Sequence, residues 1–199
     1  MTDEKDITYK KQIYIGSVNK LNCQFSFASC AVRARLLQAY CSAWYGSQNW
    51  QLNTTAVHGF HTEWNKAVRR TFRLPLCTRS KLLPYIADTQ SFTRQVECRW
   101  LKFYQCILLS SNEKVSYIGK RSLENSIGYL GRNRIHIRNK FNLNKINDMS
   151  RMPAECIDQD TQERVTVIKE LISVREGVSY IATFDNDDFA NIFDHMCTY

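Results

Sequence analysis

Residues 54–75, TTAVHGFHTEWNKAVRRTFRLP, contain the clearest fold signal in this chain of 199 residues. Thr54 or Thr55 can cap a helix that runs to about Phe72, and Leu74 followed by Pro75 stops it, because the residue before a proline is pushed out of the α region. At 100° per residue, one side of this helix is mostly apolar and the other is cationic. The first side comprises Phe60, Trp64, Ala67, Val68 and Thr71, and the second comprises Lys66, Arg69, Arg70 and Arg73. We therefore expect one face to pack and the other to present four cations.

Signals on both sides of this segment predict further helices. Apolar residues recur at helical spacing over residues 6–21, and Ser29 can cap a second helix that Gly46 ends by adopting a positive φ. The apolar stripe of the second helix consists of Val32, Leu36, Leu37, Tyr40, Ala43 and Trp44. After proline 75 we expect a short helix over residues 80–87 and a long one over 92–109. The long helix has an apolar face made of Val96, Trp100, Phe103, Tyr104 and Ile107.

The whole chain is expected to be all-α or nearly so. No segment has a strong strand pattern, and 44% apolar residues with seven Gly and three Pro suit a folded, helix-rich chain. Residues 1–125 are predicted to form a helical domain, and residues 126–153, rich in basic and Asn residues, an irregular basic connection. Residues 154–199 are predicted to be an acidic tail with helices over 159–175 and 187–195.

The net charge of +8 conceals a division along the chain. Residues 1–150 carry 23 Lys and Arg against 9 Asp and Glu, whereas residues 151–199 carry 4 against 10. A basic body favours a polyanionic partner, because cations that neutralise phosphates gain free energy from the release of counterions. An ordinary solvated basic surface explains the same composition equally well.

The composition and the motifs predict where the protein is found in the cell and which ligands it does not need. The chain has eight cysteines without a CxxC pair, a polar N-terminus and no apolar run of about 20 residues. These features indicate a soluble, intracellular protein with reduced thiols and no membrane partner. They do not distinguish the cytoplasm from the nucleus. No small-molecule substrate, cofactor or metal is expected. His58 and His61 lack a third ligand at a matching position, and the GxSxG and phosphate-loop motifs are absent. Asp187 and Asp188 are expected to begin a helix rather than bind catalytic metal.

Trp44, Tyr45 and Trp50 surround Gly46 and could be taken for a platform on which bases stack. Aromatic residues near helices more often belong to the core. We therefore expect these three to pack the second helix against the third.

Three stretches, in order, resemble the post-catalytic part of one family. Residues 2–25, TDEKDITYKKQIYIGSVNKLNCQF, resemble the linker and helix that follow the palm of jockey-like and chicken-repeat-like non-LTR retrotransposon reverse transcriptases. Residues 36–50, LLQAYCSAWYGSQNW, with residues 63–86, EWNKAVRRTFRLPLCTRSKLLPYI, are similar to that family's thumb. Residues 168–199, IKELISVREGVSYIATFDNDDFANIFDHMCTY, are similar to its extreme C-terminus.

This resemblance implies a helical thumb and tail without the catalytic centre, because the chain lacks the family's aromatic-x-Asp-Asp motif and has no endonuclease segment. It implies sequence-tolerant binding of an RNA–DNA or DNA duplex, with no catalytic residues in this chain. The expected contacts are Lys66, Arg69, Arg70 and Arg73, extended by Arg79 and Lys81. By composition alone, residues 131–145, with Arg132, Arg134, Arg138 and Lys140, can contact single-stranded or structured nucleic acid, and a disordered basic linker explains them equally well.

Two other hypotheses stay open. The chain can be a structural or protein-interaction module, in which the acidic tail folds over the basic body or docks another protein. It can also be the marginally stable product of a decayed gene copy, because the loss of the palm exposes apolar residues that it covers in the family.

Overall fold

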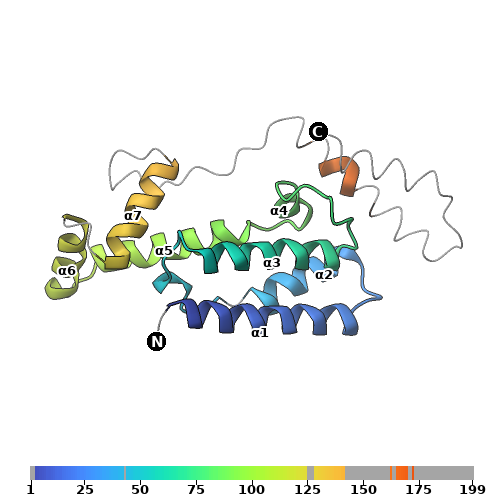
Figure 1. The fold of residues 1–199 in the computed structure, drawn as a ribbon, viewed down its shortest axis with the longest axis horizontal. Helices are drawn as coiled ribbons and strands as arrows, with labels where there is room; N and C mark the ends of the chain where they lie inside the picture. The colour runs from blue at the N-terminus through green and yellow to red at the C-terminus, as the bar shows by residue number, and fades with distance from the viewer. Residues whose placement is uncertain are drawn as a thin grey trace, which may run out of the picture. The chain divides into compact units, whose positions relative to one another are not determined.

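The structure, a computed structural model, describes residues 3–42, 44–124, 128–141, 162, 165–169 and 172, and within these residues it contains helices and no strand (Figure 1). The all-α prediction is confirmed. The helices are α1 (Asp3–Gln24), α2 (Cys30–Leu36), the π-helical turn η1 (Leu37–Cys41), the 3₁₀ turn η2 (Ser47–Asn49), α3 (Thr55–Thr71), α4 (Leu83–Ile86), α5 (Phe92–Leu108), α6 (Glu113–Glu124) and α7 (Gly128–Phe141).

The chain divides into two compact units. Unit 1 comprises Met1–Lys11, Trp44–His61 and Phe92–Cys156, and unit 2 comprises Gln12–Ala43, Thr62–Ser91 and Ile157–Tyr199. Both α1 and α3 contribute residues to each unit.

Unit 1 is organised around a cluster of aromatic rings. The ring of Phe60 on α3 lies 4.3 Å from that of Phe92 on α5, and Trp44 meets both edge-on at 5.0 and 5.2 Å between centroids. The indole nitrogen of Trp44 donates to Gln95 Oε1 at 2.8 Å, so its polar atom is satisfied inside the core. Trp50 is also buried and donates to Asp6 Oδ2 at 2.7 Å. Large rings with satisfied donors thus join three chain segments.

A buried asparagine attaches α7 to the segment before α3. Asn133 Oδ1 accepts from the backbone N–H of Leu52 at 2.8 Å, and Asn133 Nδ2 donates to the carbonyl of Trp50 at 2.8 Å. Ile137, one turn further along α7, is fully buried. Because backbone groups away from water need partners, one side chain here satisfies both a donor and an acceptor.

Unit 2 assembles α2, α4 and parts of α1 and α3 around Trp64, Val68 and Phe72, all of which are buried. Ser29 caps α2 by accepting from the N–H of Val32 at 3.5 Å, which confirms the predicted cap. From the next turn of α2, the buried Arg33 donates to the carbonyl of Thr71 at 2.6 Å.

The end of α3 differs in mechanism from the sequence prediction. The helix stops at Thr71, and Arg73 then adopts a left-handed φ of 53°, while the N–H of Leu74 reaches back to the carbonyl of Arg69 at 2.8 Å. This 6→1 bond is the Schellman arrangement, in which a left-handed residue closes the last turn. Pro75 follows a helix that has already ended.

Several predictions are wrong in detail. Residues 128–141, predicted to be irregular, form α7. Burial of Asn133 and Ile137 stabilises this helix, and the local sequence, which contains Gly and Asn, has no strong helical signal. Val32, Tyr40 and Tyr45 were expected to pack, but they are exposed. The expected face of α3 is confirmed, since all five of its residues, Phe60, Trp64, Ala67, Val68 and Thr71, are buried.

Helix α6 was not predicted, although a signal for it exists. Asn112 caps it, because its Oδ1 accepts from the N–H groups of Lys114 at 3.0 Å and Val115 at 3.4 Å. Gly119 allows α6 to approach α5, since a Cβ at this position would lie 2.5 Å from Ile107 Cγ2.

Other parts of the predicted tail cannot be compared in full. Residues 162, 165–169 and 172 are helical, in agreement with the helix expected over 159–175. The turn at Gly177 and the helix expected over 187–195 lie outside the described residues.

We predict that Asn133→Ala destabilises unit 1 strongly, because it leaves two buried backbone groups without their side-chain partner. The expected loss is about 1–3 kcal/mol of unfolding free energy for each group. Urea denaturation measures it, and Asn139→Ala, an exposed asparagine on the same helix, is the matched control with an expected change within about 0.5 kcal/mol. Equal losses in both variants would show that the two hydrogen bonds of Asn133 do not stabilise the fold.

Candidate nucleic-acid interface

The described body of unit 2 has a large excess of positive charge. Residues 12–42 and 62–91 contain nine Lys and Arg against Glu63 and Asp88. The nine cations are Lys20, Arg33, Arg35, Lys66, Arg69, Arg70, Arg73, Arg79 and Lys81. Nine cations minus two acids give these two ranges, about 60 residues, a net charge of +7, and such density attracts polyanions whatever their sequence.

The guanidinium of Arg69 is turned inward and organises the loop after α3. Its Nε and Nη2 donate to the carbonyl of Thr78 at 3.1 and 2.6 Å, and Nη2 also donates to Ser80 Oγ at 2.9 Å. Thr78 is fully buried, and burial lowers the pKa of Arg69 from its usual value. Arg69 therefore positions the chain between α3 and α4.

Arg70 and Arg73 lie at the surface and contact the end of α1 and the turn after it. Arg70 Nη1 donates to Asn19 Oδ1 at 2.8 Å, and Arg73 Nη2 donates to the carbonyl of Ser26 at 3.1 Å. Each of these bonds uses one of five N–H donors, and both side chains are exposed. An exposed guanidinium that is already held in place can meet a phosphate at a small further loss of side-chain entropy.

The other predicted cations of unit 2 are accessible to different degrees. Lys66 pairs with Glu63 at 2.9 Å one turn away, an exposed ion pair worth less than about 1 kcal/mol that phosphate can replace. Arg79 is half-buried and Lys81 is exposed on the loop between α3 and α4. Two exposed cations of the same unit, Lys20 and Arg35, were missed by the sequence analysis. The sequence feature that could have identified them is the absence of Asp and Glu from residues 12–42, which leaves their charges without acidic neighbours in that range.

The second predicted basic set, Arg132, Arg134, Arg138 and Lys140, belongs to α7 in unit 1. Lys140 is bound to the buried carboxylate of Glu97 at 2.6 Å, with His136 Nε2 at 3.6 Å from the same oxygen. Arg132 and Arg138 are exposed, and Arg134 is half-buried. At 100° per residue the cations fall on both flanks of the buried Asn133 and Ile137, so they form no single row.

The described residues contain no group of three His, Cys, Asp or Glu side chains that could hold a metal ion. His61 Nδ1 instead lies 3.0 Å from Thr93 Oγ1, a partner in the same unit. Among the described helices, none combines the length and apolar character needed to cross a bilayer.

No protein-family model, curated protein or solved structure matches this chain. What the surface of unit 2 can do is therefore inferred from its own residues.

Replacement of Arg69 is expected to destabilise the protein. Arg69→Ala removes two hydrogen bonds from the carbonyl of the buried Thr78, which lowers the unfolding free energy by about 1–3 kcal/mol. Arg70→Ala, at the next residue, breaks a bond between exposed side chains and is expected to change stability by no more than about 0.5 kcal/mol. Thermal denaturation of both variants checks this difference, and a greater loss in Arg70→Ala would contradict it.

Acid is expected to destabilise unit 1 through His61. Burial, followed by the charges of His58 and Lys140, lowers the pKa of His61 in the folded protein, so the unfolded chain binds more protons below its ordinary pKa of about 6.5. The stabilisation is present above about pH 6.5 and is lost as the pH falls below that value. Midpoints of thermal unfolding between pH 7.5 and 5.5 are expected to fall more steeply for the native protein than for His61→Gln. Parallel profiles would show that His61 does not contribute.

Proposed function

We propose that this chain binds nucleic acid through the cationic surface of unit 2, with affinity for the sugar-phosphate backbone and without preference for sequence. The observation that carries this proposal is the excess of nine cations over two acids in residues 12–42 and 62–91. The accessible contacts are Arg70, Arg73 and Lys81, with Lys66 available when it leaves Glu63. Arg69 contributes by holding the loop that carries Lys81.

The form of the surface suits a backbone rather than a base edge. Arg70 donates to Asn19 Oδ1, and Arg73 donates to the carbonyl of Ser26, so both guanidinium groups are held at the end of α1 and the turn after it. Guanidinium forks bind phosphate oxygens in the same way beside every base. The expected ligand is therefore an extended polyanion, such as an RNA–DNA or DNA duplex.

The resemblance to non-LTR retrotransposon reverse transcriptases supports the same assignment. In that family the thumb grips the template–primer duplex, and residues 36–50 with 63–86 carry the similarity to it. We propose that the chain is a thumb-and-tail fragment of such a polymerase, with no polymerase activity of its own, because the sequence lacks the aromatic-x-Asp-Asp motif.

A protein-interaction module is the second candidate function. Exposed apolar side chains in unit 2, among them Leu76 and Phe27, favour it. Large exposed apolar groups on a folded surface often mark a protein interface. Binding of a protein through these apolar groups predicts an affinity that depends little on salt, whereas phosphate binding depends strongly on it.

The nucleic-acid hypothesis is tested by fluorescence anisotropy with a 20-base-pair RNA–DNA hybrid at 50 and 200 mM salt. Native protein is expected to bind, and the logarithm of its affinity to fall by about 0.9 per neutralised phosphate for each tenfold rise in salt. The double variant Arg70→Glu with Lys81→Glu is expected to bind at least tenfold more weakly, with a shallower salt dependence.

The matched control reverses two exposed cations of α6, Lys114→Glu with Lys120→Glu, and so changes the net charge equally. Equal losses in both double variants would assign the binding to net charge rather than to unit 2. Absence of binding by the folded native protein at 50 mM salt would refute the proposal.

A further inference from the structure

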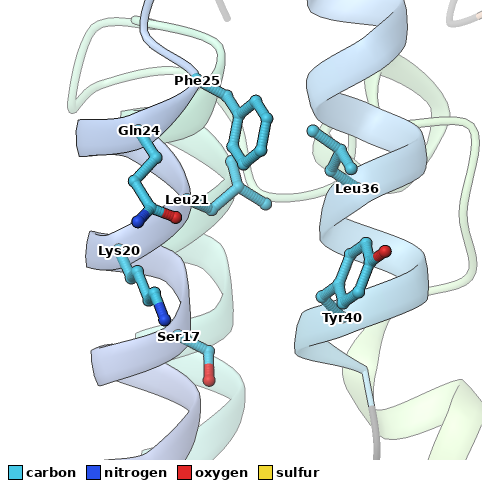
Figure 2. A pocket seen from close by; sticks show the side chains of 7 residues that line it. All are labelled: Ser17, Lys20, Leu21, Gln24, Phe25, Leu36 and Tyr40. Carbon is cyan, nitrogen blue, oxygen red and sulfur yellow. The ribbon is translucent and has the colours of Figure 1, made fainter.

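A groove of about 420 Å³ lies between α1 and the α2–η1 segment in unit 2. Leu21 and Leu36 form its apolar floor, and Lys20 and Gln24 stand at one side. Figure 2 shows Phe25 extending from the end of α1 toward the α2–η1 segment, with the ring of Tyr40 lying along that segment at the edge of the groove. Its volume falls in the range of about 300–1,000 Å³ that small organic groups occupy in proteins.

The aromatic residues of this groove continue onto the surface beside it. Tyr40 is 73% exposed, and Phe27, whose ring centroid lies 6.5 Å from that of Phe25, is 84% exposed. Rings left in water at the mouth of a groove lose the free energy that burial would supply, about 25 cal/mol for each Å². A flat ligand that covers Phe25 and Tyr40 recovers part of that free energy.

Cations accompany these rings, and the described residues that line the groove include no carboxylate. Lys20 lines the groove itself, and Arg73 donates to the carbonyl of Ser26, the residue between Phe25 and Phe27. Arg70 donates to Asn19, the neighbour of Lys20. Residues 12–42, which form both walls, contain no Asp or Glu. The groove therefore suits a ligand that joins a flat apolar face to negative charge.

We infer that this groove receives an unpaired base of single-stranded nucleic acid, stacked against Tyr40 and Phe25, with the adjoining phosphates on Lys20 and Arg73. The inference rests on the proposed function and adds to it a preference for unpaired over paired strands. Aromatic platforms beside cations bind single strands with little dependence on sequence, because every base has a π face. The bases of a duplex are stacked on each other and cannot enter the groove.

The first measurement compares the affinities of the full chain for a 12-nucleotide oligo(dT) and for a 12-base-pair duplex at one salt concentration. Tyr40→Ala is expected to weaken single-strand binding roughly tenfold, since stacking contributes about 1–3 kcal/mol for each base and 1.4 kcal/mol is tenfold. The same variant is expected to leave duplex binding unchanged. Tyr40→Phe keeps the ring and is expected to bind like the native protein.

Tyr45→Ala is the matched control, because Tyr45 is an exposed tyrosine of unit 1 that does not line the groove. Photo-crosslinking of a bromouracil oligonucleotide adds a direct readout, with Tyr40 or Phe25 expected in the crosslinked peptide. Since Tyr40 is largely exposed, its replacement is expected to leave the fold intact, which circular dichroism checks.

The outcomes separate this inference from the proposed function. Normal duplex binding together with unchanged single-strand binding by Tyr40→Ala would overturn the groove inference and leave the proposed function standing. A dimer of the native protein that Tyr40→Ala converts to monomer would also overturn it, because a second copy would then cover the groove. If the native protein binds neither the duplex nor the single strand, the proposed function is refuted.

Discussion

The carboxyl end of α3 is the point on which unit 2 depends, and guanidinium groups hold it. The last carbonyls of a helix lack intrahelical partners and carry the negative end of the helix dipole. Arg33, from α2, donates to the carbonyl of Thr71 at 2.6 Å, while Arg73, in a left-handed conformation, reaches the carbonyl of Ser26. Arg69 then fixes the loop that leads to α4. Four segments of the chain thus meet around one helix end.

Some of the positive charge of unit 2 therefore belongs to arginines that hold the fold and not to cations that are accessible to a ligand. Arg33 is buried, and the half-buried Arg69 holds the carbonyl of Thr78, so both guanidinium groups have a structural role. Their charges still contribute to the electrostatic potential at the surface, which extends over a Debye length of about 8 Å at physiological salt. Under the proposed function, accessible cations such as Lys81 are the ones expected to contact phosphate, and the less accessible ones strengthen the field around them.

Sequence reasoning succeeded where apolar periodicity was strong and failed where tertiary contacts decide. The faces of α3 follow directly from 3.6-residue periodicity, and the cap at Ser29 follows from its chemistry. Helix α7 has a weak pattern, and its stability depends on Asn133, whose partners Trp50 and Leu52 are distant in sequence. The cationic row expected on α3 is not formed as predicted, because Arg69 turns toward Thr78 and Arg73 lies beyond the end of the helix in a left-handed conformation. The groove beside Tyr40 needs two helices and could not be found from one.

Charge by itself does not choose between a nucleic acid and an acidic protein segment as the partner of unit 2. Both would bind the same cations, and the affinity of both would fall with salt, although a duplex, with one negative charge per 1.7 Å of axis, would show the steeper fall. Residues 151–199 of the chain itself, with ten acids against four bases, are a competitor of this kind. The exposed rings of Phe25, Phe27 and Tyr40 add a second requirement, because they favour a partner that offers flat apolar groups beside its negative charge. Each unpaired base carries such a face beside its phosphate, whereas an acidic segment offers one only where an aromatic side chain lies near its carboxylates.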